Sequence, residues 1–159
     1  MGMPSLTILA MPNPFRGHIG VIQRNAITSW TKLQPRPEII LFGTEEGVEE
    51  CVNDLGLVHI PELARNHYGT PLLGDIFARA EQRATCHVLA YVNADIILPS
   101  EITVGVERTR REFSRFLAVG RRTNLDVHES IDFSNGWEAK KDNLPTSSRS
   151  RERRYWMDQ

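Results

Sequence analysis

Short runs of apolar residues alternate along this chain with segments whose apolar residues recur every three or four positions. Such runs are typical of strands buried on both faces, and the longer spacing is typical of helices that pack by one face. The sequence therefore predicts an α/β fold: a mainly parallel sheet with helices on both faces. The predicted strands are residues 6–10, 38–42, 57–60, 88–92 and 116–119. We expect the strands at 6–10, 39–42 and 88–92 to be central and buried.

Four helices are predicted between these strands. The first follows the breakers around Pro12, and Thr44 is expected to cap the second, which stops at Gly56. Thr70 followed by Pro71 predicts the start of the third, and Pro99 with Ser100 that of the fourth. The predicted inward-facing residues are Ile19, Ile22, Ala26, Trp30 and Leu33; Val48, Cys51, Val52 and Leu55; Leu73, Ile76, Phe77, Ala80 and Ala84; and Ile102, Val106 and Phe113.

Composition divides the chain at about residue 127. Residues 1–127 carry the strand and helix pattern and form the predicted α/β domain, whereas residues 128–159 have few aliphatic residues and predict an irregular or disordered polar tail. The Arg/Ser-rich run at residues 146–154 is compatible with RNA binding. Such a run is more often a solvated tail, and the net charge of −1 does not favour nucleic acid.

Further patterns narrow the class of protein. No apolar stretch reaches 18 residues, so no membrane span is predicted, and the amino terminus lacks a secretory signal. Cys51 and Cys86 have no CxxC spacing, and we expect both to be reduced core residues of a cytoplasmic protein.

The most informative motif is Asn93-Ala94-Asp95, which ends the apolar run at residues 88–92. Ligands of open α/β sheets bind outside the carboxyl ends of the strands. A carboxylate there can bind Mg²⁺ or Mn²⁺, which in turn neutralises a diphosphate. The alternative is that Asp95 is an ordinary turn or cap residue.

Three segments resemble a family of GT-A-type glycosyltransferases, the nucleotide-diphospho-sugar transferase-like domains of bacteria and plants. They are PNPFRGHIGVIQRNA at residues 12–26, ARNHYGTPL at residues 64–72 and YVNADI at residues 91–96. The resemblance covers roughly residues 5–135. It implies that the loop after the first strand and the loop after the third strand hold the nucleotide.

The resemblance also implies roles for individual residues. The family's metal-binding D-x-D element stands here as Asn93-Ala94-Asp95, so Asp95 is the implied ligand of Mn²⁺ or Mg²⁺. Asn93 could contact the ribose or a metal-bound water. The residues implied to bind the nucleotide-sugar are Pro12, Asn13, Arg65, Asn66, Gly69, Asn93, Asp95 and Arg121. Arg121 and Arg122 could equally be a solvated pair.

The resemblance fades near Phe133, before the second lobe that binds the acceptor in such folds. We therefore expect a nucleotide-sugar donor as ligand, an unknown acceptor, weak or absent transferase activity of this chain alone, and a tendency to self-associate. Two classes remain open: an enzyme completed by another chain, and a non-catalytic nucleotide or nucleotide-sugar binding module. A third alternative is a flavodoxin-like or nucleotidyltransferase-like domain.

Overall fold

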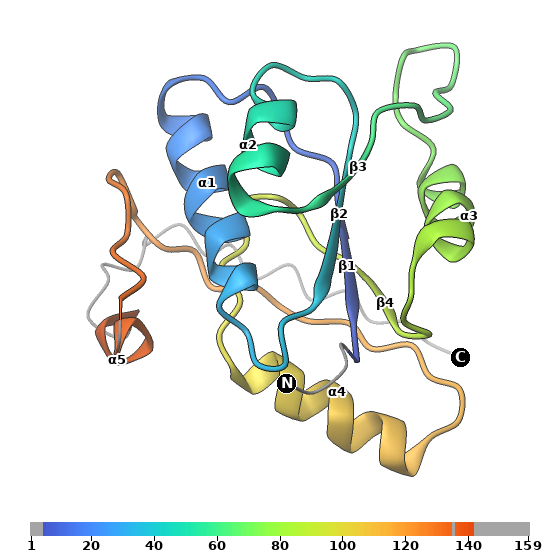
Figure 1. Ribbon diagram of the computed structural model, residues 1–159, viewed down its shortest axis with the longest axis vertical. Coiled ribbons are helices and arrows are strands. Elements are labelled where there is room, and N and C mark those ends of the chain that lie inside the picture. The colour runs from blue at the N-terminus through green and yellow to red at the C-terminus, as the bar shows by residue number, and fades with distance from the viewer. Residues whose placement is uncertain (1–4, 135, 142–159) are drawn as a thin grey trace, which may run out of the picture.

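The computed structural model describes residues 5–134 and 136–141. Four strands and five helices lie in these residues (Figure 1). The strands are β1 Thr7–Ala10, β2 Glu38–Phe42, β3 Val58–Ile60 and β4 Leu89–Tyr91. The helices are α1 Gly17–Thr31, α2 Val48–Leu55, α3 Leu73–Arg83, α4 Glu101–Glu112 and α5 Trp137–Lys141.

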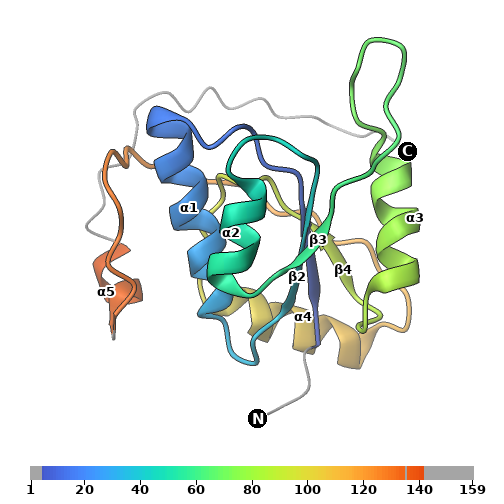
Figure 2. The ribbon, with the colours of Figure 1, turned by 45° about the horizontal axis from the view of Figure 1, so that its top comes forward.

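The strands form one parallel sheet in the order β3-β2-β1-β4. From β1 the chain moves outward through β2 to β3, and then returns to the other side of β1 to form β4. Helices α1 and α2 cover one face of the sheet and α3 covers the other (Figures 1 and 2). The predicted α/β class is confirmed, and the strand order reverses between β1 and β4.

Alternate residues of the central strands supply two apolar cores, as the period of two in a strand requires. Ile8 of β1 packs towards α1 and α2, where it joins Trp30 and Cys51, whereas the neighbouring Leu9 packs towards Ile76 of α3. All five of these side chains are buried. Because both faces are covered, β1 after Thr7 and β2 after Glu38 can be apolar at every position.

The predicted fifth strand at residues 116–119 is wrong. This segment has no regular structure, and Leu117 and Val119 are 91% and 86% exposed. An apolar run becomes a strand only when its backbone pairs with a neighbour, and within the described residues nothing pairs with the outer side of β4. β4 is consequently an edge strand with Tyr91 exposed, so the prediction that residues 88–92 are central is also wrong.

Two predicted helix starts are displaced. The residue before α2 is Gly47, with φ of 85°, and no side chain caps the helix, so Thr44 is not its cap. Pro71 forms an antiparallel bridge with Arg65, which delays α3 until Leu73. In both places, residues that were predicted to begin the helix belong instead to the loop before it.

The inward face of α4 is also narrower than predicted. Thr103 is buried and Val106 packs against the core, but Ile102 and Phe113 are exposed. Ile19 and Leu73, predicted as inward-facing on α1 and α3, are exposed as well. Spacing along a helix identifies a face, but not how far neighbouring elements cover it.

Residues beyond 127 contact the α/β body. The Asn25 side chain donates to the backbone oxygen of Glu129 and accepts from the backbone nitrogen of Ile131, both at 2.9 Å. Glu138 of α5 accepts hydrogen bonds from the backbone nitrogen and hydroxyl of Ser100. The Arg/Ser-rich run at residues 146–154, for which a disordered tail is predicted, lies outside the described residues. Within the described part of the chain, no helix has the length and apolar character needed to cross a membrane.

Candidate functional site

A pocket of about 360 Å³ opens at the carboxyl ends of β1 and β4. It lies where the strand order reverses, which is the position that ligands occupy in open α/β sheets. Its volume falls within the range of small-molecule sites. The lining residues are Met11, Asn13, Ile19, Ile22, Gln23, Asn93, Ala94 and Asp95.

The loop after β1 is held by a buried amide from α1. The Gln23 side chain accepts a hydrogen bond from the backbone nitrogen of Asn13 at 2.7 Å and donates one to the backbone oxygen of Asn13 at 2.8 Å. Gln23 is 2% exposed, so its amide is satisfied by these two bonds inside the protein. This pairing fixes Asn13 at the mouth of the pocket, next to the buried Pro12.

The same loop packs closely against α1 and the start of α2. A Cβ at Gly20 would lie 2.9 Å from the backbone carbon of Phe15, and a Cβ at Gly47 would lie 2.7 Å from the Cβ of Phe15. The backbone nitrogen of Phe15 also donates to the backbone oxygen of Glu46 at 2.8 Å. Arg16 forms a salt bridge with Glu46 beside it. Glycine at these two positions therefore permits a tight loop with one conformation.

The segment after β4 is held from α1 as well. The backbone nitrogen of Ile96 donates to the backbone oxygen of Asn93, which closes a turn around Asp95. The indole nitrogen of Trp30 donates to the backbone oxygen of Ile96 at 2.8 Å, and the Ser29 hydroxyl accepts from the backbone nitrogen of Leu98. Helix α1 thus positions both loops that carry the polar lining residues.

The pocket has one carboxylate, that of Asp95, and the side-chain amides of Asn13, Gln23 and Asn93. Carboxylate and amide oxygens are ligands that Mg²⁺ accepts, commonly with one or two carboxylates completed by phosphates and water. No group of three or more His, Cys, Asp or Glu side chains is arranged to hold a metal among residues 5–134 and 136–141. Among the described lining residues, Asp95 is the one carboxylate that could hold such a cation, and a bound phosphate and water would have to complete its ligands.

The predicted residues Arg65, Asn66 and Gly69 do not line this pocket. They form a separate loop between β3 and α3. The side-chain oxygen of Asn66 accepts from the backbone nitrogens of Tyr68 and Thr70, and Gly69 has φ of 81°. Tyr68 is exposed.

Arg65 connects this loop to the end of β2. Its guanidinium donates to the Gly69 backbone oxygen and to Glu45 Oε1, both at 3.0 Å. Glu45 Oε2 is buried and has no hydrogen-bond partner among the described residues. Arg65, which the resemblance implies as a nucleotide-sugar-binding residue, is thus paired with a carboxylate of the protein.

Arg121, the last predicted residue, is exposed on the irregular segment after α4 and does not line the pocket. Its expected place at the end of a fifth strand does not exist, because that strand does not form. The structure thus gathers Asn13, Asn93 and Asp95 in one pocket, beside Pro12, and leaves the other four predicted residues outside it.

Sequence reasoning missed Gln23, Ile19 and Ile22 as pocket residues. A signal was present for Gln23, because it is a polar residue within the apolar stripe that continues to Ala26 and Trp30. A buried amide in such a stripe usually has a specific partner.

Comparisons with known proteins find no family model, no curated protein and no solved structure that matches this chain significantly. The fold and the pocket define an α/β domain with a ligand-sized site at the switch point, where the strand order reverses between β1 and β4.

Proposed function

We propose that this chain binds a nucleotide-diphospho-sugar through a divalent cation, as the donor-binding domain of a glycosyltransferase. The observation that carries the proposal is the pocket at the β1–β4 switch point, which brings Asn13, Asn93 and Asp95 together. A nucleoside diphosphate needs amide groups for its polar edges and a cation for its charge. The sequence resemblance to GT-A-type transferases is the reason for proposing a nucleotide-sugar as the diphosphate ligand.

The cation would be Mg²⁺ or Mn²⁺, held by Asp95 with the amide oxygen of Asn93 nearby. When bound, it would offset the negative charge that develops on a departing nucleoside diphosphate. Asn13, fixed by Gln23, would hydrogen-bond the nucleotide at the opposite wall. Met11, Ile19 and Ile22 provide apolar area along the remaining wall.

A non-catalytic nucleotide-sugar binding module is the second candidate. Among the described residues that line the pocket, Asp95 is the only ionisable one, and the proposal assigns it to the cation. A general base for an acceptor hydroxyl would have to come from elsewhere. This observation favours binding without turnover by the isolated chain.

The test is thermal unfolding and calorimetry with a panel of nucleoside diphosphates and their sugars, each with and without Mn²⁺. A ligand that binds only the native state stabilises it by about 2.7 kcal/mol at 100 times its Kd. We expect one nucleotide-sugar to stabilise the chain, and Mn²⁺ to strengthen the effect. Loss of the response in Asp95→Asn, with an unchanged unfolding temperature of the free protein, would support the assigned role.

Glu49→Gln is the matched control, because Glu49 is an exposed carboxylate on α2 that does not line the pocket. It should bind as the unchanged protein does. If no nucleotide stabilises the chain, or if Asp95→Asn keeps its Mn²⁺-linked affinity, the proposal is wrong. Turnover assays with candidate acceptors then separate the transferase from the binding module.

A further inference from the structure

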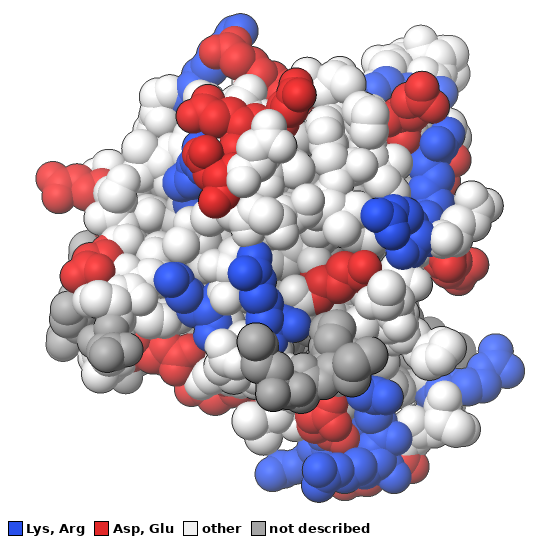
Figure 3. Space-filling model, in the orientation of Figure 1, with Lys and Arg blue, Asp and Glu red and all other residues white. Residues whose placement is uncertain are grey.

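The surface formed by residues 107–122 differs in charge from the rest of the chain. This segment, which we call the basic strip, contains six arginines and two glutamates, a formal charge of +4. The whole chain carries −1, so the remainder carries −5. Figure 3 shows Lys and Arg side chains gathered at the end of the molecule where α4 lies, and acidic side chains over α2. Basic side chains also lie near α3 in this view, but the largest gathering is at the α4 end.

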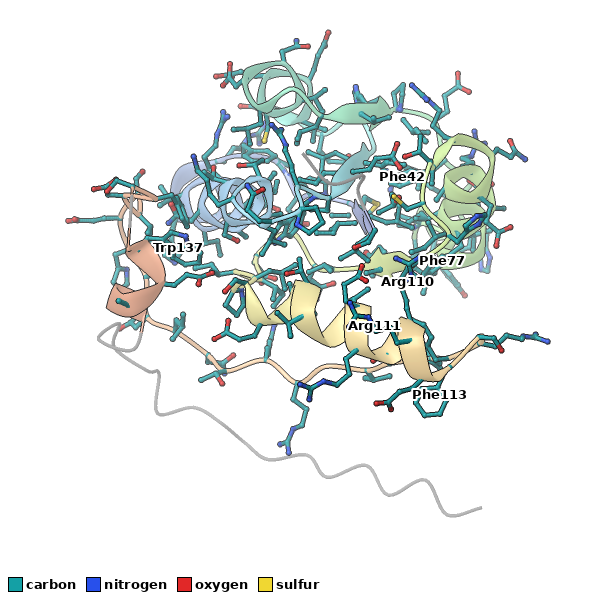
Figure 4. All side chains as sticks on the ribbon, turned by 60° about the horizontal axis from the view of Figure 1, so that its bottom comes forward. Phe42, Phe77, Arg110, Arg111, Phe113 and Trp137 are labelled. Atoms are coloured by element: carbon teal, nitrogen blue, oxygen red, sulfur yellow. The ribbon has the colours of Figure 1, made fainter. Side chains whose placement is uncertain are left out.

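The basic strip also exposes large apolar side chains. Phe113 is 56% exposed, and in Figure 4 it points away from the sheet at the C-terminal end of α4. Leu117 and Val119 are the most exposed large apolar residues of the described chain. All six arginines of the strip are exposed, and only Arg110 has an ion-pair partner within the described residues, namely Glu107.

Isolated exposed apolar residues are ordinary, but several within one basic segment indicate an interaction surface. Arginines attract an anionic surface, and apolar side chains between them can enter the boundary between lipid headgroups and acyl chains. Leu117 and Val119 protrude from an irregular segment, so they do not form a shaped patch for a complementary protein. A fluid lipid surface requires no such shape.

We propose that the basic strip binds peripherally to an anionic lipid membrane. Each arginine would lie near the lipid phosphates, and Phe113, Leu117 and Val119 would insert shallowly. Single-stranded nucleic acid is held by stacking on aromatic rings. The strip exposes two such rings, Phe113 and Phe116, but its two most exposed apolar residues are aliphatic, which favours the lipid surface.

The first experiment is co-sedimentation of the full chain with vesicles of phosphatidylcholine, alone or mixed with phosphatidylserine. We expect binding only to the mixed vesicles at about 0.1 M salt, and loss of that binding at about 1 M, where the Debye length falls from about 10 Å to about 3 Å. The salt dependence requires no variant. Absence of binding to mixed vesicles, or equal binding to both kinds, would overturn the proposal.

Two double variants then separate charge from insertion. Arg111→Ala with Arg115→Ala should weaken binding about 30-fold, since each arginine near an anionic surface contributes about 1 kcal/mol and 1.4 kcal/mol is tenfold. Leu117→Ser with Val119→Ser should weaken it at least about tenfold. Arg83→Ala and Leu73→Ser, exposed positions on α3, are the matched controls and should bind as the unchanged chain does.

Parallel titrations with single-stranded RNA complete the test. RNA binding that survives Leu117→Ser with Val119→Ser, together with no vesicle binding, would identify a nucleic-acid surface and overturn the membrane proposal. None of the varied residues lines the pocket at the switch point. Nucleotide-sugar binding should therefore be the same in all variants, so the two proposals succeed or fail separately.

Discussion

Gln23→Met is the substitution that tests most directly how the pocket is built. Methionine has nearly the volume of glutamine, so the core around position 23 stays filled while both hydrogen bonds to Asn13 are lost. Each such bond contributes a net of about 0.5–1.5 kcal/mol. Asn13 lies on the exposed loop, so water can replace part of the loss. We expect a decrease of about 2 kcal/mol in the free energy of unfolding.

For a domain of this size, 1 kcal/mol corresponds to about 2–4 °C, so the unfolding temperature should fall by about 4–8 °C. Gln82→Met, the same change at an exposed position on α3, should stay within about 0.5 kcal/mol of the unchanged protein. Nucleotide-sugar affinity should also fall in Gln23→Met, because the Asn13 loop would no longer be fixed. An unchanged unfolding temperature would refute the hydrogen-bond argument, and lower stability with unchanged affinity would exclude the Asn13 loop from the site.

Three further predictions concern other parts of the chain. Hydrogen bonds from the Ala64 backbone N–H and from Arg79 lower the pKa of Asp75 below its ordinary 3.8. The ionised Asp75 therefore stabilises the fold fully above pH 3.8, and this contribution is lost as the pH falls through the lowered pKa. The difference in unfolding temperature between the unchanged protein and Asp75→Asn should shrink below about pH 4, and a constant difference would contradict this. Burial raises the pKa of the Cys51 thiol to about 11. Iodoacetamide at pH 8 should therefore modify Cys86 in the native protein but Cys51 only after denaturation, as peptide mass mapping would show. Labelling of Cys51 in the native protein would count against its burial. The outer side of β4, which no described residue pairs with, should support weak self-association that Tyr91→Lys reduces. Sedimentation at several protein concentrations measures this, and a monomer at every concentration would argue against it.

The sheet was predictable from sequence because its signal is local. Runs such as Ile39–Phe42 are apolar at every position, and only a strand covered on both faces tolerates that. The run at residues 116–119 is also apolar at every position but forms no strand. Strand formation depends on a partner, and the presence of a partner is a property of the whole chain that no window of sequence contains.

The site was predictable to the extent that topology determines it. Asn13, Asn93 and Asp95 meet because each follows a parallel strand, and the carboxyl ends of neighbouring parallel strands lie at one edge. Arg121 depended on a strand that does not form. Arg65 follows β3, at the same end of the sheet, but β2 and β1 lie between β3 and β4. Which loops lie close together at the carboxyl end of the sheet depends on the order of the strands, and the pattern of apolar residues does not determine that order.

The position of the pocket follows from the path of the chain and does not depend on the family resemblance. Right-handed crossovers place α1 and α2 on one face because the chain moves from β1 towards β3, and they place α3 on the other face because it then returns to β4. The loop after β1 leads into α1, and the segment after β4 packs against the same helix. The pocket lies between these two segments, outside the carboxyl ends of the two strands. Helix α1 fixes both sides of the pocket through Gln23 and Trp30. If no nucleotide-sugar binds, the prediction of a small-molecule site between Asn13 and Asp95 remains, and a screen of other phosphorylated ligands against Asp95→Asn is the experiment that decides it.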